Sequence, residues 1–153
     1  MEYNEGLYFV TICTNHMIHR FGEIHDGIMD YSPVGHFVDI ELSHSQIHHP
    51  HIEVPLYVVM PNHLHAIVAV GTRRAASASD RAISLPERSH MLLSTYIASL
   101  KSAVTRFAHT NGFQMEWQTR YHDHAIRGTD ELNNIAQYIK NNVARWETDR
   151  FFS

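Results

Sequence analysis

The sequence predicts an α+β fold, a ferredoxin-like sandwich in which helices pack on one face of an antiparallel sheet. Two observations favour this class. Segments with strand and helix patterns follow one another in the order strand, hairpin, helix, two strands, helix, strand, helix. The two strands in the middle are separated only by Pro61-Asn62, a connection short enough for antiparallel neighbours. Such a sandwich leaves the second face of the sheet open, where a site on a central strand could lie.

The N-terminal elements have clear local signals. Residues 7–13 (LYFVTIC) are rich in β-branched and aromatic side chains, which is typical of a buried strand. Residues 21–31 contain an Asp-Gly pair between two short runs, which predicts a β-hairpin. Ser32-Pro33 then supplies an N-cap residue and a first-turn proline, so we expect a helix to begin there.

The middle of the chain predicts two strands, a loop and a long helix. Residues 52–60 and 63–70 are the two strands, and residues 71–87, rich in Arg, Ala and Ser, predict an exposed loop. An amphipathic helix is expected from about Ser89 to His109. Its buried positions would be Leu93, Ile97, Leu100, Val104 and Phe107.

The C-terminal part predicts one more strand and one more helix. Residues 117–127 are the expected strand with its approach, and Thr129 is the expected N-cap of the last helix. The apolar stripe of this helix consists of Leu132, Ile135, Ala136, Ile139 and Val143.

Length and composition limit the class of protein. A chain of 153 residues is expected to form one domain over residues 1–153, with a core that needs no metal or disulfide for stability. The one cysteine, Cys13, has no partner for an intramolecular disulfide and is expected to fill space in the core of a cytoplasmic protein. The N-terminus is acidic, and no apolar run approaches the roughly 20 residues that span a bilayer. We therefore expect no membrane association.

The charge distribution is more informative than the net charge of −4. Residues 1–72 hold one basic and eight acidic side chains, whereas residues 73–153 hold eleven basic and eight acidic ones. Binding to nucleic-acid phosphates needs a local basic patch rather than a basic total. A solvated surface of mixed charge is the competing interpretation. The candidate DNA contacts are Arg73, Arg74, Lys101, Arg106, Arg120 and Arg127.

His63 and His65 form the most informative motif. On a strand they point to the same face, while Leu64 between them points to the other face and can anchor the strand in the core. Two imidazoles side by side can bind one divalent metal. Structural zinc usually has four Cys or His ligands, so Mg²⁺ or Mn²⁺ with further oxygen ligands fits better. Two unrelated histidines among the fourteen in the chain are the alternative.

Two other groups of residues could carry chemistry. Tyr138 and Asn142 are four residues apart in the predicted last helix, so they lie on one face, at the flank of the apolar stripe. A half-buried tyrosine and a frayed helix end would give the same pattern. His122 and His124 share one face of the predicted last strand and could form a second metal pair with the first two histidines. The alternative is a structural role, in which His124 and Arg127 bond to backbone or phosphate.

Four blocks of the sequence, in this order, resemble the single-tyrosine HUH transposases of insertion sequences, and most closely the REP-associated tyrosine transposases. The resemblance covers nearly the whole chain. The blocks are Phe9-Val-Thr-Ile with Phe21-Gly-Glu-Ile, then Met60-Pro-Asn-His-Leu-His65, then Leu100-Lys-Ser-Ala-Val-Thr-Arg106, and finally 117–127 with Tyr138-Ile-Lys-Asn-Asn142 and Trp146.

This resemblance implies an HUH-type endonuclease fold and a metal-dependent strand transferase. His63, His65 and Asn142 would bind Mg²⁺ or Mn²⁺, and Tyr138 would attack single-stranded DNA beside a hairpin, giving a 5′-phosphotyrosine. Relatives act as monomers or as homodimers that exchange the tyrosine helix. The family usually has a proline after the paired asparagines, where this chain has Val143, so the helix could be one turn longer.

Two other functions remain open at the level of the sequence. The first is a catalytically idle protein that binds hairpin DNA, and the second is a histidine-rich metal-binding protein unrelated to DNA. The filled catalytic positions favour the enzyme over the first. The basic segment 73–106 and the tyrosine argue against the second.

Overall fold

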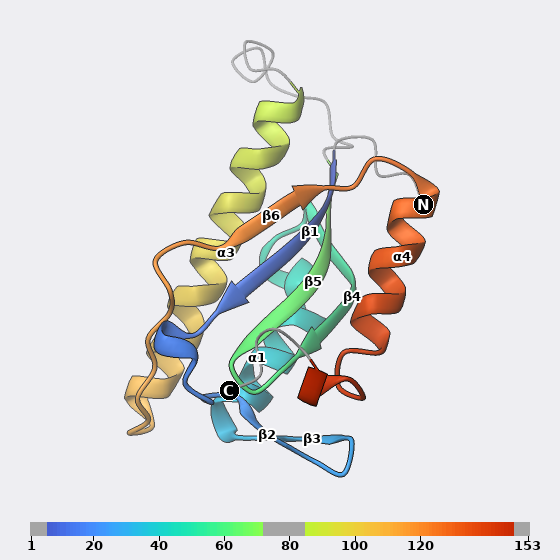
Figure 1. Cartoon of the computed structure of the whole chain (residues 1–153). Coiled ribbons are helices and arrows are strands. Elements are labelled where there is room, and N and C mark those ends of the chain that lie inside the picture. Colours follow the sequence, from blue (N-terminus) through green and yellow to red (C-terminus); the bar gives the residue numbers. More distant parts are fainter. Residues whose placement is uncertain (1–5, 72–84, 149–153) are drawn as a thin grey trace.

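A four-stranded antiparallel sheet forms the centre of the protein (Figure 1), with its strands in the order β4-β5-β1-β6. The structure is a computed structural model and describes residues 6–71 and 85–148. The strands are β1 (Gly6–Cys13), β4 (Ile52–Val59), β5 (His63–Val70) and β6 (His122–Ala125). A separate hairpin consists of β2 (Gly22–His25) and β3 (Ile28–Tyr31). The predicted strands and the hairpin are thus confirmed, although β6 is shorter than predicted.

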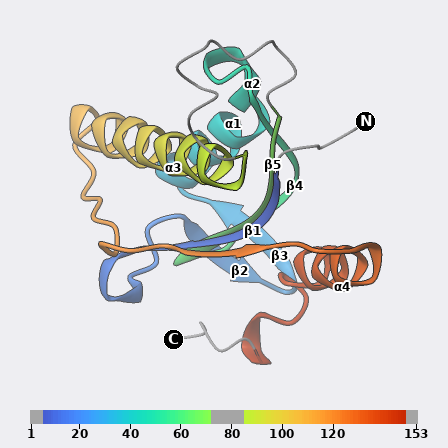
Figure 2. The same cartoon turned by 90° about the horizontal axis from the view of Figure 1, so that it is seen from above.

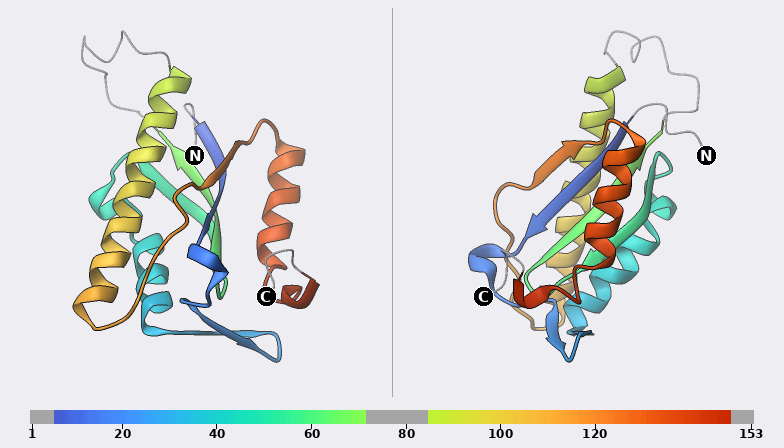
Figure 3. Two further views of the ribbon diagram at one scale, coloured as in Figure 1. Left: turned by 60° about the vertical axis from the view of Figure 1, so that its left-hand side comes forward. Right: turned by 45° about the vertical axis from the view of Figure 1, so that its right-hand side comes forward.

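The helices lie on both faces of the sheet (Figures 2 and 3). The long α3 (Leu85–Thr110) lies with α1 (Pro33–Ser43) and α2 (Ser45–His48) on one face, and α4 (Thr129–Lys140) lies on the other. The predicted α+β class is confirmed, but the expectation that helices occupy one face only is wrong. The second face carries apolar and aromatic side chains of its own, and α4, with Ile139 buried, covers part of it.

Strand register separates two kinds of side chain. Ile12 of β1 lies opposite Leu64 of β5, and both belong to the core beneath α1 and α3. The alternate positions face α4: Thr11 lies opposite His65, and Cys13 lies opposite His63. Leu64 is fully buried, as expected for the anchor of the His-Leu-His motif. The two histidines are therefore held on the central strand with their side chains on the α4 face.

The ends of the helices correct several expectations. Ser32 caps α1 as predicted, since its hydroxyl accepts a hydrogen bond from the Gly35 N–H at 3.0 Å. Thr129 does not cap α4, because the N-cap is Gly128 and Thr129 is already the first helical residue. The expectation of a longer last helix is also wrong. After Lys140 the chain turns at Asn141, and the Asn142 N–H bonds Ile139 O over three residues.

The predicted loop 71–87 can be compared with the structure only at its ends. Residues 72–84 lie outside the described part of the chain, and α3 already begins at Leu85, before the predicted start at Ser89. Within 6–71 and 85–148, no helix is long and apolar enough to cross a membrane.

Candidate active site

The two histidines of β5 are fully buried and held by neighbours at one ring nitrogen each. Their ring centroids are 4.7 Å apart. His63 Nδ1 lies 2.7 Å from Asn62 Oδ1, and His65 Nδ1 lies 2.8 Å from the Thr11 hydroxyl oxygen. An amide oxygen only accepts hydrogen bonds, so His63 Nδ1 donates to it, and in the neutral imidazole this leaves the lone pair on Nε2. Histidine ligands of metals are oriented in this way in proteins, with one nitrogen bonded to a neighbour and the other on the metal.

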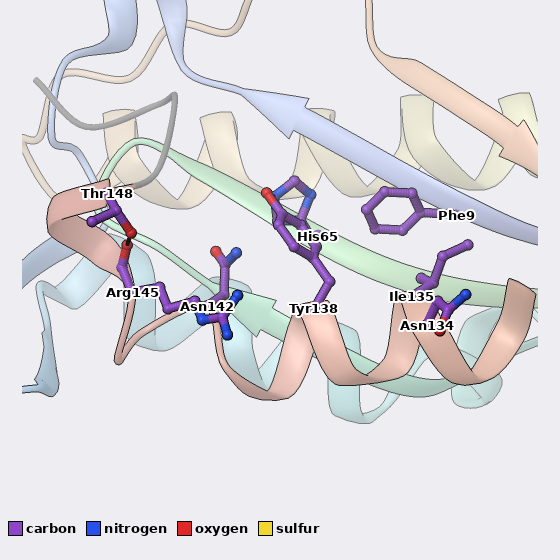
Figure 4. A pocket seen from close by; sticks show the side chains of 8 residues that line it. All are labelled: Phe9, His65, Asn134, Ile135, Tyr138, Asn142, Arg145 and Thr148. Atoms are coloured by element: carbon purple, nitrogen blue, oxygen red, sulfur yellow. Dashed lines mark hydrogen bonds between the residues drawn. The ribbon is translucent and has the colours of Figure 1, made fainter.

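Tyr138 approaches this pair from α4. Its hydroxyl lies 3.5 Å from His65 Nε2, and its ring meets the His65 ring edge to face with centroids 5.2 Å apart (Figure 4). The distance is longer than that of an ordinary hydrogen bond, so the pair is in contact without a strong bond. Tyr138 is 39% exposed. The Tyr138 hydroxyl is thus next to an imidazole nitrogen, a group that commonly binds metals, and the side chain as a whole remains partly exposed to solvent.

Asn142 joins the site from the turn that follows α4. It is 2% exposed, and its Oδ1 is buried without a hydrogen-bond partner among the described residues. A buried acceptor without a partner costs free energy, and a bound ion is one of the common reasons for it. Two imidazole nitrogens and one amide oxygen are a suitable partial ligand set for Mn²⁺, and for Mg²⁺ with added water or phosphate oxygens. The residues present therefore fit a divalent cation.

A cavity of about 550 Å³ is lined by His65, Tyr138 and Asn142 together (Figure 4). The sequence did not single out five of its residues as site residues. For three of them a signal exists: Asn134 and Ile135 are one helical turn before Tyr138, and Phe9 shares a strand face with Thr11. The lining residues are Phe9, His65, Asn134, Ile135, Tyr138, Asn142, Arg145 and Thr148.

His122 and His124 do not form a second metal pair with His63 and His65. His124 Nε2 lies 2.9 Å from a carboxylate oxygen of Glu131, which also accepts the Arg127 N–H at 2.8 Å. These bonds hold the pKa of Glu131 below its ordinary value. Among the described residues, no group of three or more His, Cys, Asp or Glu side chains could hold a metal ion. His124 has a structural contact, but its partner is the Glu131 side chain rather than backbone or phosphate, and this contact links β6 to the first turn of α4.

None of the four candidate DNA contacts that the structure describes lines the cavity at Tyr138. Arg73 and Arg74 lie outside the described residues. Lys101 donates to Gln118 O at 2.9 Å, and partial burial lowers its pKa. Arg106 lines a different cavity, between α3 and the α1–α2 segment, on the face of the sheet away from Tyr138. Arg120 and Arg127 are exposed at the two ends of β6.

Comparison with known proteins supports the fold class. No protein-family model matches the chain. An uncharacterised protein of Haemophilus influenzae is 29% identical over 155 residues, which cover 97% of this chain and 86% of that protein. The solved structure of a REP-associated tyrosine transposase bound to a REP hairpin matches with a TM-score of 0.59 and 20% identity, over 92% of this chain and 68% of that one. The protein described here therefore has the α+β fold of the REP-associated tyrosine transposase, with a four-stranded antiparallel sheet and with α4 on the face opposite α3.

Proposed function

We propose that this protein, as a single domain over residues 1–153, is a metal-dependent endonuclease and strand transferase acting on single-stranded DNA beside hairpins. The observation that carries the proposal is the position of the Tyr138 hydroxyl, 3.5 Å from His65 Nε2 in a cavity that Asn142 also lines. A nucleophile and metal-ligating groups within one accessible cavity are the equipment for covalent cleavage of a phosphodiester.

His63, His65 and Asn142 would hold the divalent cation, Mg²⁺ or Mn²⁺. Bound there, it would supply positive charge to the phosphate oxygens and to the leaving oxygen. Asn62 and Thr11 orient the two imidazoles before any metal binds, so ligand reorganisation on binding is small.

Tyr138 would attack the scissile phosphorus. The new bond joins the Tyr138 phenolic oxygen to phosphorus, and the bond to the 3′ oxygen of the upstream nucleotide breaks. The phenol proton is released to solvent through the open side of the cavity, and the 3′ oxygen takes up a proton to become a hydroxyl. The phosphotyrosine retains the energy of the ester, so this hydroxyl can later attack it and join strands without ATP.

Two observations support the proposed substrate class. The matching solved structure is of a protein bound to a REP hairpin. In the present chain, Tyr138 is half exposed but its hydroxyl lies within a cavity. A flexible single strand can place a phosphate there more easily than a duplex, whose phosphates lie on the surface of a rigid cylinder. We infer single-stranded DNA flanking a REP-like palindrome as the substrate.

The experiment that tests this function detects the covalent bond. Protein incubated with Mn²⁺ and a hairpin with single-stranded flanks should retain the DNA 3′ of the cut, attached through Tyr138. Tyr138→Phe removes one oxygen and keeps the ring, so it should bind DNA and form no adduct.

Tyr121→Phe is the matched control, since the Tyr121 hydroxyl lies 2.9 Å from that of Ser94, on α3. It should form the adduct as the parent does. An adduct that persists in Tyr138→Phe would assign the nucleophile elsewhere. Binding without any adduct in the parent would favour the idle hairpin-binding protein.

A further inference from the structure

The cavity at Tyr138 is larger than the proposed cleavage reaction requires. A scissile phosphate needs only the region near Tyr138, His65 and Asn142, whereas the cavity of about 550 Å³ is within the range of roughly 300–1,000 Å³ typical of pockets for small organic ligands. Figure 4 shows lining residues on both sides of Tyr138 along α4. Phe9, Ile135 and Asn134 lie on one side.

The two ends of the cavity differ in chemistry. The first end combines the aromatic ring of Phe9, the aliphatic side chain of Ile135 and one amide, that of Asn134. The second end has the Arg145 side chain, together with the Thr148 hydroxyl, which donates to Arg145 O at 3.0 Å. The first end suits an apolar planar group with polar edges, and the second suits an anion.

We propose that Phe9, Ile135 and Asn134 form a pocket for the unpaired base of the nucleotide next to the scissile phosphate, with Arg145 at the neighbouring phosphate. This inference rests on the proposed function and adds to it a site of base recognition. The base stacks on Phe9 and packs on Ile135, and the Asn134 amide reads its hydrogen-bonding edge.

Three physical points support this assignment. Bases of single strands stack on aromatic side chains, whereas bases in a duplex have no free face to offer. An asparagine amide has a donor and an acceptor side by side, which matches the edge of an adenine. Asn134 and Ile135 are one turn from Tyr138 on the same helix, so a base held by them places its own phosphate within reach of the nucleophile.

The test uses hairpin DNA with 2-aminopurine at one flank position at a time, in buffer without metal. Its fluorescence falls when it stacks, so the scan reports the seated base without any cleavage. One flank position should show the largest quenching in the parent. In Phe9→Leu the quenching at that position should be lost, and affinity should fall by about 5- to 150-fold, the range for one lost base–aromatic stack.

Asn134→Ala and Asn133→Ala form a matched pair on α4. Both residues are exposed, and both substitutions remove the same amide group, but only Asn134 lines the cavity. Asn134→Ala should lower the preference for one base at the quenched position by about 5- to 150-fold, and Asn133→Ala should leave it unchanged. Because Asn134 is exposed on a helix surface, this pair remains informative if Phe9→Leu folds poorly.

The outcomes separate the base pocket from the proposed chemistry. Quenching that depends on Phe9, without an adduct in the cleavage assay, supports the pocket and refutes the reaction. An adduct together with equal quenching at all flank positions, or identical base preferences in the two asparagine variants, overturns the pocket and leaves the reaction standing. No binding of flank DNA at all overturns both.

Discussion

At the residue scale, the imidazoles of His63 and His65 are oriented by two buried side chains, Asn62 and Thr11. Asn62 is the neighbour of His63 in the sequence, while Thr11 is 54 residues from His65 and meets it only because β1 and β5 pair in this register. The first contact could be expected from the Asn-His dipeptide. The second could not, because it depends on strand pairing across the sheet.

Thr11→Val tests the orienting role of the threonine. Valine keeps the shape and the strand propensity but removes the oxygen that lies 2.8 Å from His65 Nδ1. We expect Mn²⁺ affinity, measured by calorimetry, to fall by about 10- to 100-fold, the usual effect of losing such a partner. Thr11→Ser retains the hydroxyl and should restore most of the affinity. Equal affinities in all three proteins would show that His65 needs no such partner or is no ligand.

His63→Ala tests the metal site itself. Loss of this ligand should abolish Mn²⁺- or Mg²⁺-dependent cleavage of single-stranded DNA and metal binding, while circular dichroism retains the native spectrum. His122→Ala is the control, since His122 is an exposed histidine of the edge strand β6. Full activity of His63→Ala, or cleavage that a chelator does not affect, would contradict the metal role.

At the element scale, α4 is the helix whose placement decides the site. Its amphipathic stripe predicts that it packs on a sheet, but a stripe carries no information about which face of the sheet it covers. The sequence therefore predicted the helix and the adjacency of Tyr138 and Asn142, and it missed that α4 lies on the face opposite α3. It also missed that Asn142 lies in the turn beyond the helix, because a single bend at Asn141 decides this.

Glu131 connects the first turn of α4 to β6, and this link can be tested by hydrogen exchange. Glu131→Gln weakens the bonds to His124 and to the Arg127 N–H, so amides of α4 should exchange faster while those of α3 do not change. Asp130→Asn is the control: it is in the same turn and loses the same charge near the helix N-terminus. If the amides of α4 exchange equally fast in the two variants, Glu131 acts only through its charge near the helix N-terminus and not through its hydrogen bonds.

The same link has a pH dependence of known sign. The pKa of Glu131 is lowered in the folded protein, so the carboxylate stabilises the docked helix at pH values above the ordinary glutamate range. This stabilisation is lost as the pH falls through the lowered pKa. The parent should thus lose protection of α4 on acidification more steeply than Glu131→Gln, as measured by exchange in a pH series.

At the scale of the whole molecule, the sheet has two faces, and the candidate basic residues do not all lie on the same one. Tyr138 and the cavity are on the α4 face, and Arg106 is on the α3 face. Arg120 and Arg127 flank β6, at the edge between the two faces. The excess of basic residues in the second half of the sequence indicated phosphate binding, but charge counts hold no information about which side of a sheet a residue occupies.

Salt dependence can show which of these surfaces the DNA contacts. Each phosphate neutralised by a cation contributes about −0.7 to the slope of log affinity against log salt for a single strand and about −0.9 for a duplex. For a short single strand, the slope should become shallower by about 0.7, the contribution of one phosphate, in each of Arg120→Gln and Arg127→Gln. It should stay unchanged in Arg106→Gln. For a hairpin with a stem that extends to the α3 face, Arg106→Gln should also reduce the slope. Lys101→Gln should instead lower the melting temperature, since Lys101 donates to Gln118 O.

If the slope measured with the hairpin is the same in Arg106→Gln as in the parent, the DNA does not contact the α3 face. The stem of the hairpin would then have to lie along β6 and α4.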